Sequence, residues 1–170
     1  MDKIEELLKD PKTDLQKQAL TDKSYKKTPN NQDCKINFEL ATYGDAILKC
    51  ALCKIYFERE DEDNFGFKGK LTEWKKQYES DEVLVRVVAK HYKLLKFLKY
   101  DKKGNGKPKE QKPRNYKHKG QNDKDRHKYI ATAMEACIAA VYIENGENEV
   151  IEIVKKWIRW IDKETNSSDT

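Results

Sequence analysis

The chain has 170 residues, which is enough for one domain with a buried core and too few for two. Its 35 Lys or Arg outnumber 30 Asp or Glu by only five, so the position of the basic residues matters more than their excess. No apolar window is long enough to cross a membrane and no signal-like stretch opens the chain, so we expect an intracellular protein, cytoplasmic or nuclear, without a membrane partner.

The N-terminal third is predicted to be helical. Turn-breaking residues are few, with seven Gly and four Pro, which favours helices over strands and predicts an all-α fold. A short amphipathic helix is expected over residues 2–9, ended by Pro11, and a second one over residues 15–20. A polar connection over residues 26–33 then leads to the central segment.

The central segment, residues 37–57, reads NFELATYGDAILKCALCKIYF and is largely apolar. It is longer than a typical strand and predicts a buried helix. Asp45 is the one acid in its interior, and an ionised carboxylate there is costly unless it is paired, hydrogen-bonded or bound to a cation. Asp45 is therefore a candidate site residue, with a capped or solvent-reaching carboxylate as the alternative.

Two more helices are predicted over residues 71–78 and 81–98. In the second, mostly apolar residues recur at spacings of three and four, which favours a continuous amphipathic helix packed on the core. These residues are Leu84, Val87, Val88, His91, Leu94, Leu95 and Leu98. We assign no function to His91.

Most of the excess positive charge lies in residues 101–128. This stretch holds eleven Lys or Arg against four acids, so the rest of the chain carries a net charge of −2. It has no apolar periodicity and is long for a connection inside a domain. Such a basic stripe suits a polyanion, with nucleic acid as the leading candidate, and a solvated lysine-rich loop is the alternative.

The chain ends in two predicted helices. Residues 129–143, YIATAMEACIAAVYI, form an apolar segment whose only charge is Glu135, and Gly146 is expected to end this helix. An amphipathic helix should follow over residues 149–161, and then a polar tail over residues 163–170.

Asp45 and Glu135 are thus lone acids on two apolar helices. If these helices cross with the acids facing each other, the two charges repel until one acid is protonated or a divalent cation lies between them. Mg²⁺ is commonly held by one or two carboxylates together with substrate phosphates, and Mn²⁺ is an alternative ion. The acid pair and the basic stretch together predict a nuclease.

Four segments, in order, resemble the catalytic domain of the ribonuclease III family. Residues 19–25, ALTDKSY, are similar to its early Ala-Leu-Thr-His-Lys/Arg-Ser-Tyr element, with Asp22 where His is usual. Residues 37–48, NFELATYGDAIL, resemble its signature helix, Asn-Glu-Arg-Leu-Glu-Phe-Leu-Gly-Asp-Ala-Val-Leu. Residues 69–72, GKLT, and 135–143, EACIAAVYI, resemble its Gly-x-Leu-Ser/Thr and Glu-Ala-Leu-Ile-Gly-Ala-Ile-Tyr-Leu segments.

The family's four metal-site acids fall at Ala41, Asp45, Thr132 and Glu135, so half of the acidic set is missing. This reduced set is similar to the Mini-III branch, which has the same Ala and Thr, carries an Arg-Asn pair in the preceding loop, and is active with the Asp and Glu alone. The longer N-terminal element departs from that branch, so the subfamily stays open. The alternative is a degenerate member that keeps the fold to bind double-stranded or ribosomal RNA without cutting it.

The resemblance implies a helical bundle around the signature helix, with a catalytic domain over residues 1–162 and no double-stranded RNA binding domain in this chain. It implies a Mg²⁺-dependent endoribonuclease that processes double-stranded RNA. Asp45 and Glu135 would bind the metal, and the hydroxyl of Thr132 would hold a water molecule beside it. The residues expected to contact RNA are Lys102, Lys103, Lys107, Lys109, Lys112, Arg114, Asn115, Lys117 and Lys119.

The resemblance also implies a homodimer with the signature helix at its interface, through Phe38, Ala41, Thr42 and Tyr43. The aromatic residue that usually enters the partner corresponds to Thr42, and Tyr43 lies about 100° away around the helix. A helical protein-interaction domain with a solvated lysine-rich loop is a third interpretation of the chain.

Overall fold

The structure, a computed structural model, describes residues 1–28, 30–59, 69–101 and 121–167, and the side chains of all of these except residues 121–127 and 167. Within these ranges the regular structure is helical, apart from a single bridge between Thr21 and Lys99. The all-α prediction is therefore confirmed. None of the described helices combines the length and the apolar character that crossing a membrane requires.

The elements follow one another as short N-terminal helices, a long central helix, a broken middle stretch and two long C-terminal helices. They are α1 (Lys3–Lys9), α2 (Asp14–Ala19), the 3₁₀-helix η1 (Tyr25–Lys27), α3 (Phe38–Arg59), α4 (Lys70–Glu79), α5 (Asp81–Val83), the π-helix η3 (Leu84–Ala89), α6 (Lys90–Tyr92), the 3₁₀-helix η4 (Leu94–Lys96), α7 (Gln121–Asn145) and α8 (Glu147–Ser167). The helices predicted over residues 2–9, 15–20, 37–57, 71–78, 129–143 and 149–161 are all present.

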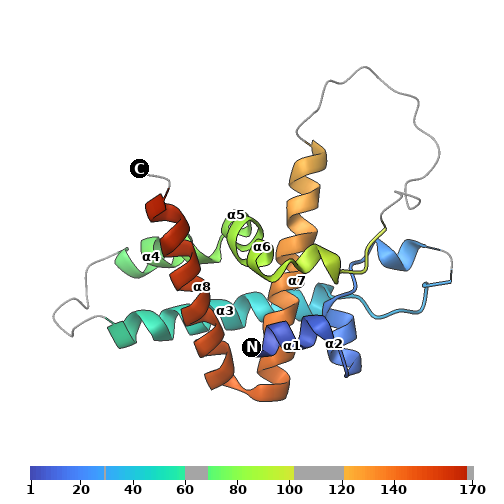
Figure 1. Cartoon of the computed structure of the whole chain (residues 1–170), viewed down its shortest axis with the longest axis horizontal. Helices are drawn as coiled ribbons and strands as arrows, with labels where there is room; N and C mark the ends of the chain where they lie inside the picture. The colour runs from blue at the N-terminus through green and yellow to red at the C-terminus, as the bar shows by residue number, and fades with distance from the viewer. Residues whose placement is uncertain (29, 60–68, 102–120, 168–170) are drawn as a thin grey trace.

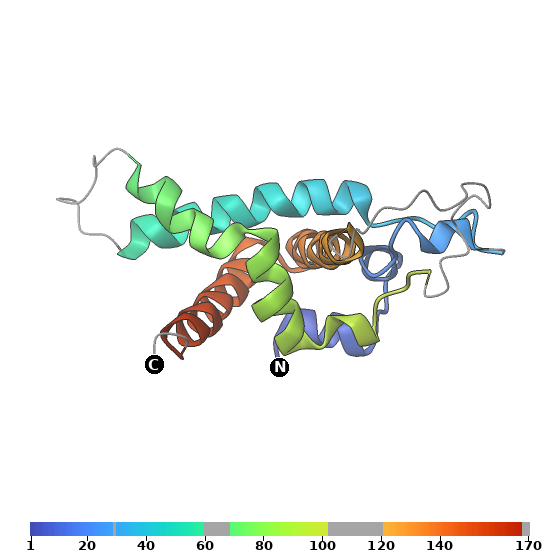
Figure 2. The same ribbon diagram turned by 90° about the horizontal axis from the view of Figure 1, so that it is seen from above.

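α7 is the core helix of the molecule. It crosses beneath α3, and α8 packs against both (Figures 1 and 2). Residues 136–140 are completely buried, which explains why this helix has no polar stripe. One hydrophobic core extends from Ile4 at the N-terminus to Ile161 in α8.

The prediction of one continuous helix over residues 81–98 is wrong. The chain there passes from α5 through the π-helix η3 into α6. This helical stretch ends at Lys93, whose φ of 54° is left-handed. A π-helix has more residues per turn, so it shifts the buried face, and Tyr92 points into the core in place of His91. His91 instead stacks on Trp160 at the surface, with ring centroids 4.5 Å apart.

A long-range contact explains why the helix ends. Lys99 donates its backbone N–H to the carbonyl of Leu20 at 2.8 Å, and its own carbonyl accepts from Asp22 at 2.9 Å. The chain has to extend after η4 to reach this partner. No Gly or Pro lies between residues 81 and 98, so nothing in the local sequence marks the break.

The C-terminal helix continues into the predicted polar tail, residues 163–170. α8 ends at Ser167, and Thr165 donates its hydroxyl to the carbonyl of Ile161 at 3.0 Å. The polar residues after Ile161 include no Gly or Pro, so the helix continues although its last residues bury little surface.

Candidate functional site

A glycine lets α3 and α7 approach each other closely. A Cβ atom placed on Gly44 would overlap the carbonyl oxygen of Glu135 and lie 2.6 Å from the carbonyl carbon. Any side chain would therefore force the two helix backbones apart. The residue that follows, Asp45, lies beside Glu135 at this crossing, and its charge acts on that of Glu135.

The environment of Glu135 favours its protonated form. Burial of its carboxyl group raises the pKa to about 7, and the negative charges of Asp45 and Asp81 act in the same direction. Lys49 lowers this pKa, with a smaller effect. Repulsion by Asp45 is thus one cause of the raised pKa, after burial, and a site shared by the two acids stays a prediction.

Lys49 is a functional candidate that the sequence analysis misses. Its Nζ donates to Asp45 Oδ2 at 2.6 Å, and the two side chains are 43% and 36% exposed. This hydrogen bond raises the pKa of Lys49, and the charges of Glu79 and Glu135 raise it further. The spacing of four residues along α3 is a signal that could have revealed the pair.

Two further acids act on the site from the turn between α4 and α5. Asp81 affects the pKa of Glu135, and Glu79 affects that of Lys49. Ser80, between them, caps α5 by accepting from the N–H of Val83 at 3.3 Å. Glu79 also lies 3.4 Å from the ammonium of Lys75. No local pattern in the sequence places this turn beside α7.

The acids present fit a magnesium ion held by two carboxylates. Asp45 and Glu135 supply the hard oxygen donors that Mg²⁺ prefers, and a cation between them would oppose the repulsion from Asp45, which adds to burial in raising the pKa of Glu135. Among the described residues, no three His, Cys, Asp or Glu side chains come together in a way that could hold a metal ion. The remaining positions around Mg²⁺ would fall to water and to phosphate oxygens.

Ala41 and Thr132, the two positions where the family has acids that this chain lacks, differ in their exposure to solvent. Ala41 is 4% exposed and belongs to the core, so it faces no solvent. Thr132 is partly exposed and donates its hydroxyl to the carbonyl of Lys128 at 2.8 Å. Its oxygen can still accept a hydrogen bond, which a water molecule at the site would supply.

The predicted interface residues lie at the start of α3, and all of them except one are exposed. Phe38 and Tyr43 are 59% and 47% exposed, and Thr42 is exposed. Ala41, in contrast, is buried and has no surface to offer to a second copy. Tyr43 also lines an apolar hollow of about 210 Å³ together with Tyr142 of α7.

The predicted RNA-contacting residues lie outside the described residues. They are Lys102, Lys103, Lys107, Lys109, Lys112, Arg114, Asn115, Lys117 and Lys119. Their contribution to a site stays a prediction from the charge of the sequence.

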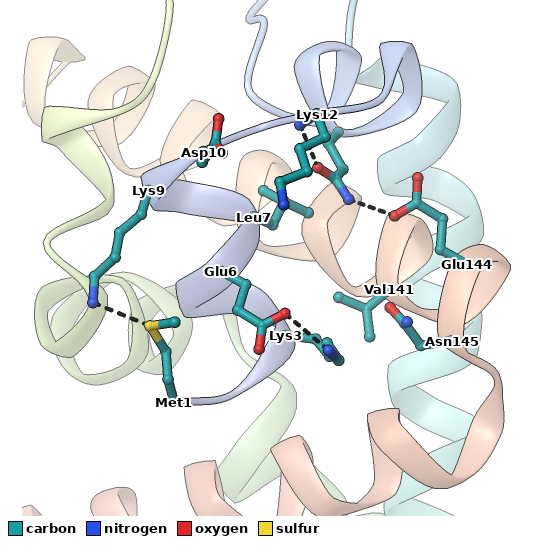
Figure 3. Close-up of a pocket in the computed structure, with 11 residues that line it drawn as sticks. Met1, Lys3, Glu6, Leu7, Lys9, Asp10, Lys12, Val141, Glu144 and Asn145 are labelled. Carbon is teal, nitrogen blue, oxygen red and sulfur yellow. Dashed lines mark hydrogen bonds and ion pairs between the residues drawn. The ribbon is translucent and has the colours of Figure 1, made fainter.

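A cavity of about 380 Å³ lies elsewhere, between α1, α2 and the end of α7 (Figure 3). Lys3 and Glu6 on its wall pair with each other at 2.8 Å, and Glu144 accepts from Gln16 at 2.6 Å. None of the predicted site residues lines this cavity, so we do not include it in the candidate site.

Comparison with known proteins gives one family and a set of similar folds. A family model described as ribonuclease-III-like matches residues 12–160. The nuclease domain of ribonuclease III from Campylobacter jejuni aligns with a TM-score of 0.60 and 21% sequence identity, over 94% of both chains. That structure is described as flexible in a region involved in dimer formation. A second structure of the same domain aligns with a TM-score of 0.59 and 21% identity, over 95% of this chain and 92% of that one.

Proposed function

Because the chain belongs to the ribonuclease-III-like family, we propose that it is a Mg²⁺-dependent endoribonuclease that cleaves double-stranded RNA during RNA processing. The observation that carries the proposal is the close approach of α3 and α7 at Gly44 and Glu135, where the charge of Asp45 acts on Glu135. Two acids from helices far apart in the sequence repel each other when they are brought together, and a divalent cation between them relieves that repulsion.

The residues of the site have different roles in this proposal. Asp45 and Glu135 would hold the ion through carboxylate oxygens, which would require Glu135 to lose its proton. Bound Mg²⁺ would supply the Lewis acidity that activates a water molecule for in-line attack on a phosphodiester and stabilises the departing oxygen. Thr132 accepts a hydrogen bond from a water molecule and orients it, since its own proton is given to the carbonyl of Lys128.

The basic stretch holds the substrate in this proposal. Lysines and Arg114 between residues 102 and 119 bind phosphates, and recognition follows the shape of the A-form duplex more than its sequence. The support is the charge of residues 101–128, where eleven basic residues stand against four acids.

The active form in this proposal is a homodimer joined through exposed residues of α3. Exposed Phe38 and Tyr43 support it, because large apolar side chains at the surface of one helix suit a protein interface. The similar nuclease domain from Campylobacter jejuni is described as having a region involved in dimer formation. Two sites across such a dimer would cut the two strands with a stagger.

A second candidate is a ribonuclease III fold that binds RNA without cutting it. Ala41 and Thr132 stand where the family has acids, and Lys49 already occupies one oxygen of Asp45. Both observations favour this candidate, which predicts duplex binding but no cleavage.

Incubation with long duplex RNA, in Mg²⁺ or in EDTA, tests the proposal. The wild type should shorten the duplex only in Mg²⁺. Asp45→Asn and Glu135→Gln should each slow cleavage by at least about 100-fold, because losing residues that merely support metal ligands already costs about 10- to 100-fold. Glu152→Gln, on the exposed face of α8, is the matched control and should cut like the wild type.

Each alternative has its own outcome in this experiment. Duplex that shifts in a gel but stays intact supports the second candidate. Cleavage that survives both Asp45→Asn and Glu135→Gln shows that the site is elsewhere. A protein that neither binds nor cuts the duplex is better explained as a protein-interaction domain.

A further inference from the structure

The acid pair already holds a cation that belongs to the chain. The ammonium of Lys49 donates to Asp45 Oδ2 at 2.6 Å. Charges on three elements act on it, namely Asp45 on α3, Glu79 at the end of α4 and Glu135 on α7. Lys49 therefore lies in the same negative field that would attract a metal ion.

A metal ion and this ammonium cannot use Asp45 independently. The hydrogen bond engages Oδ2, so an ion bound to the same carboxylate has to share that oxygen or take the other one beside a positive charge. Two cations at that separation repel each other. Entry of the ion is easier once Lys49 has left Asp45, which its long and partly exposed side chain permits.

We propose that Lys49 is a resident counter-ion that competes with the divalent cation for Asp45 and so raises the metal concentration at which the site fills. This inference rests on the proposed function, since it assigns a regulation to the same metal site. Without metal, Lys49 balances one of the two acids. With metal, it is released and its charge becomes available for a phosphate of the substrate.

The chain offers a matched control for this role. Lys54 lies on the same helix, its side chain is also 43% exposed, and it also pairs with a carboxylate, Glu147, at 3.2 Å. Glu147 belongs to α8 and is no part of the acid pair. Lys49→Met and Lys54→Met therefore remove the same charge from α3, and only the first removes it from Asp45.

Isothermal titration calorimetry of Mg²⁺ into the metal-free protein, without RNA and at constant ionic strength, measures the competition directly. Lys49→Met should bind Mg²⁺ about two- to fivefold more tightly than the wild type, the range expected for loss of one partly exposed ion pair. Lys54→Met and Lys49→Arg should bind like the wild type. Lys49→Gln is the second variant if Lys49→Met does not fold, as judged by circular dichroism.

The outcomes separate this inference from the function on which it rests. Equal or weaker Mg²⁺ binding by Lys49→Met overturns the competition and leaves the metal site in place. An equal gain in Lys54→Met also overturns it, because a general effect of charge then explains the result. If neither the wild type nor Lys49→Met binds Mg²⁺ or Mn²⁺, the proposed metal site fails, and the inference fails with it.

Discussion

Glu135 has a charge that depends on its surroundings near neutral pH. Burial, then the charges of Asp45 and Asp81, raise its pKa to about 7. A carboxyl group with such a pKa is protonated in mildly acidic solution, and it becomes a metal ligand only when that proton leaves. Its burial and its charged neighbours on α3 and α5 therefore control what this side chain can do.

We predict that Glu135→Gln stabilises the metal-free protein at high pH. Because folding raises this pKa from 4.5 to about 7, the stability that Glu135 contributes is fully present below about pH 4.5 and is lost as the pH rises through about 7. A glutamine has no charge to bury. The free energy of unfolding of the variant should exceed that of the wild type by about 1 to 2 kcal/mol at about pH 8. This value is smaller than the full pKa shift implies, because water screens a half-buried carboxylate.

Urea unfolding in EDTA, at several pH values from about 4.5 to 8, measures this difference. The gap between Glu135→Gln and the wild type should close toward the acidic end. Glu152→Gln on α8 is the control, and its stability relative to the wild type should not change with pH in this way. A gap that is constant across the range would mean that the charge of Glu135 is not its cause.

At the scale of elements, the crossing of α3 and α7 decides whether there is a site at all. The two helices approach so closely because Gly44 has no side chain. α8 packs on both helices and holds them in this arrangement. A site assembled from single residues of separate helices tolerates little change in their spacing, since metal ligands act over short and fixed distances.

We predict that Gly44→Ala destabilises the protein by about 2 kcal/mol or more. An overlap with backbone atoms should cost at least the upper end of the usual overpacking range, about 3 kcal/mol or more, and the better helix propensity of alanine returns about 1 kcal/mol. The added Cβ would overlap the Glu135 carbonyl, so the helices have to separate. Mg²⁺ affinity should fall together with stability, as titration and urea unfolding would show.

Ala46→Ser is the control for this substitution. It also adds one heavy atom to α3, two positions further along, but at an exposed residue. Its stability should stay within about 0.5 kcal/mol of the wild type. Equal effects of the two substitutions would contradict a role for the close crossing.

At the scale of the whole molecule, α3 keeps several large apolar side chains at the surface. α7 and α8 lie beneath it in Figure 2, and Phe38, Tyr43 and Phe57 of α3 remain exposed. Large apolar side chains gathered on one surface element commonly mark an interface. A second copy of the chain is the partner that the family resemblance implies.

We predict that Phe38→Ser and Tyr43→Ser each weaken a homodimer. A central aromatic residue of an interface typically contributes about 2 kcal/mol or more, so the dissociation constant should rise by about 30-fold or more. Sedimentation equilibrium of the wild type and the variants measures this constant. Leu95→Ser is the control, because Leu95 is 37% exposed but lies on η4, away from α3. A wild type that sediments as a monomer at all concentrations would contradict the predicted dimer.

The sequence by itself determined the helical class, six of the predicted helices, the family and the two acids. These features are local. An apolar run without Pro predicts a buried helix wherever it lies, and a lone Asp45 or Glu135 is conspicuous within such a run. The ribonuclease III fold expected from four short segments is confirmed by the family model over residues 12–160 and by two similar nuclease domains.

Only the tertiary structure decided how these parts meet. The break within residues 81–98 follows from the contact of Lys99 with Leu20, and no local residue announces it. The burial of Ala41 and the influence of Glu79 and Asp81 likewise depend on which helices become neighbours. Contacts between residues distant in sequence carry no periodic signal, so the acid pair could be anticipated from the chain, whereas the counter-ion and the close crossing beside it became visible only in the fold.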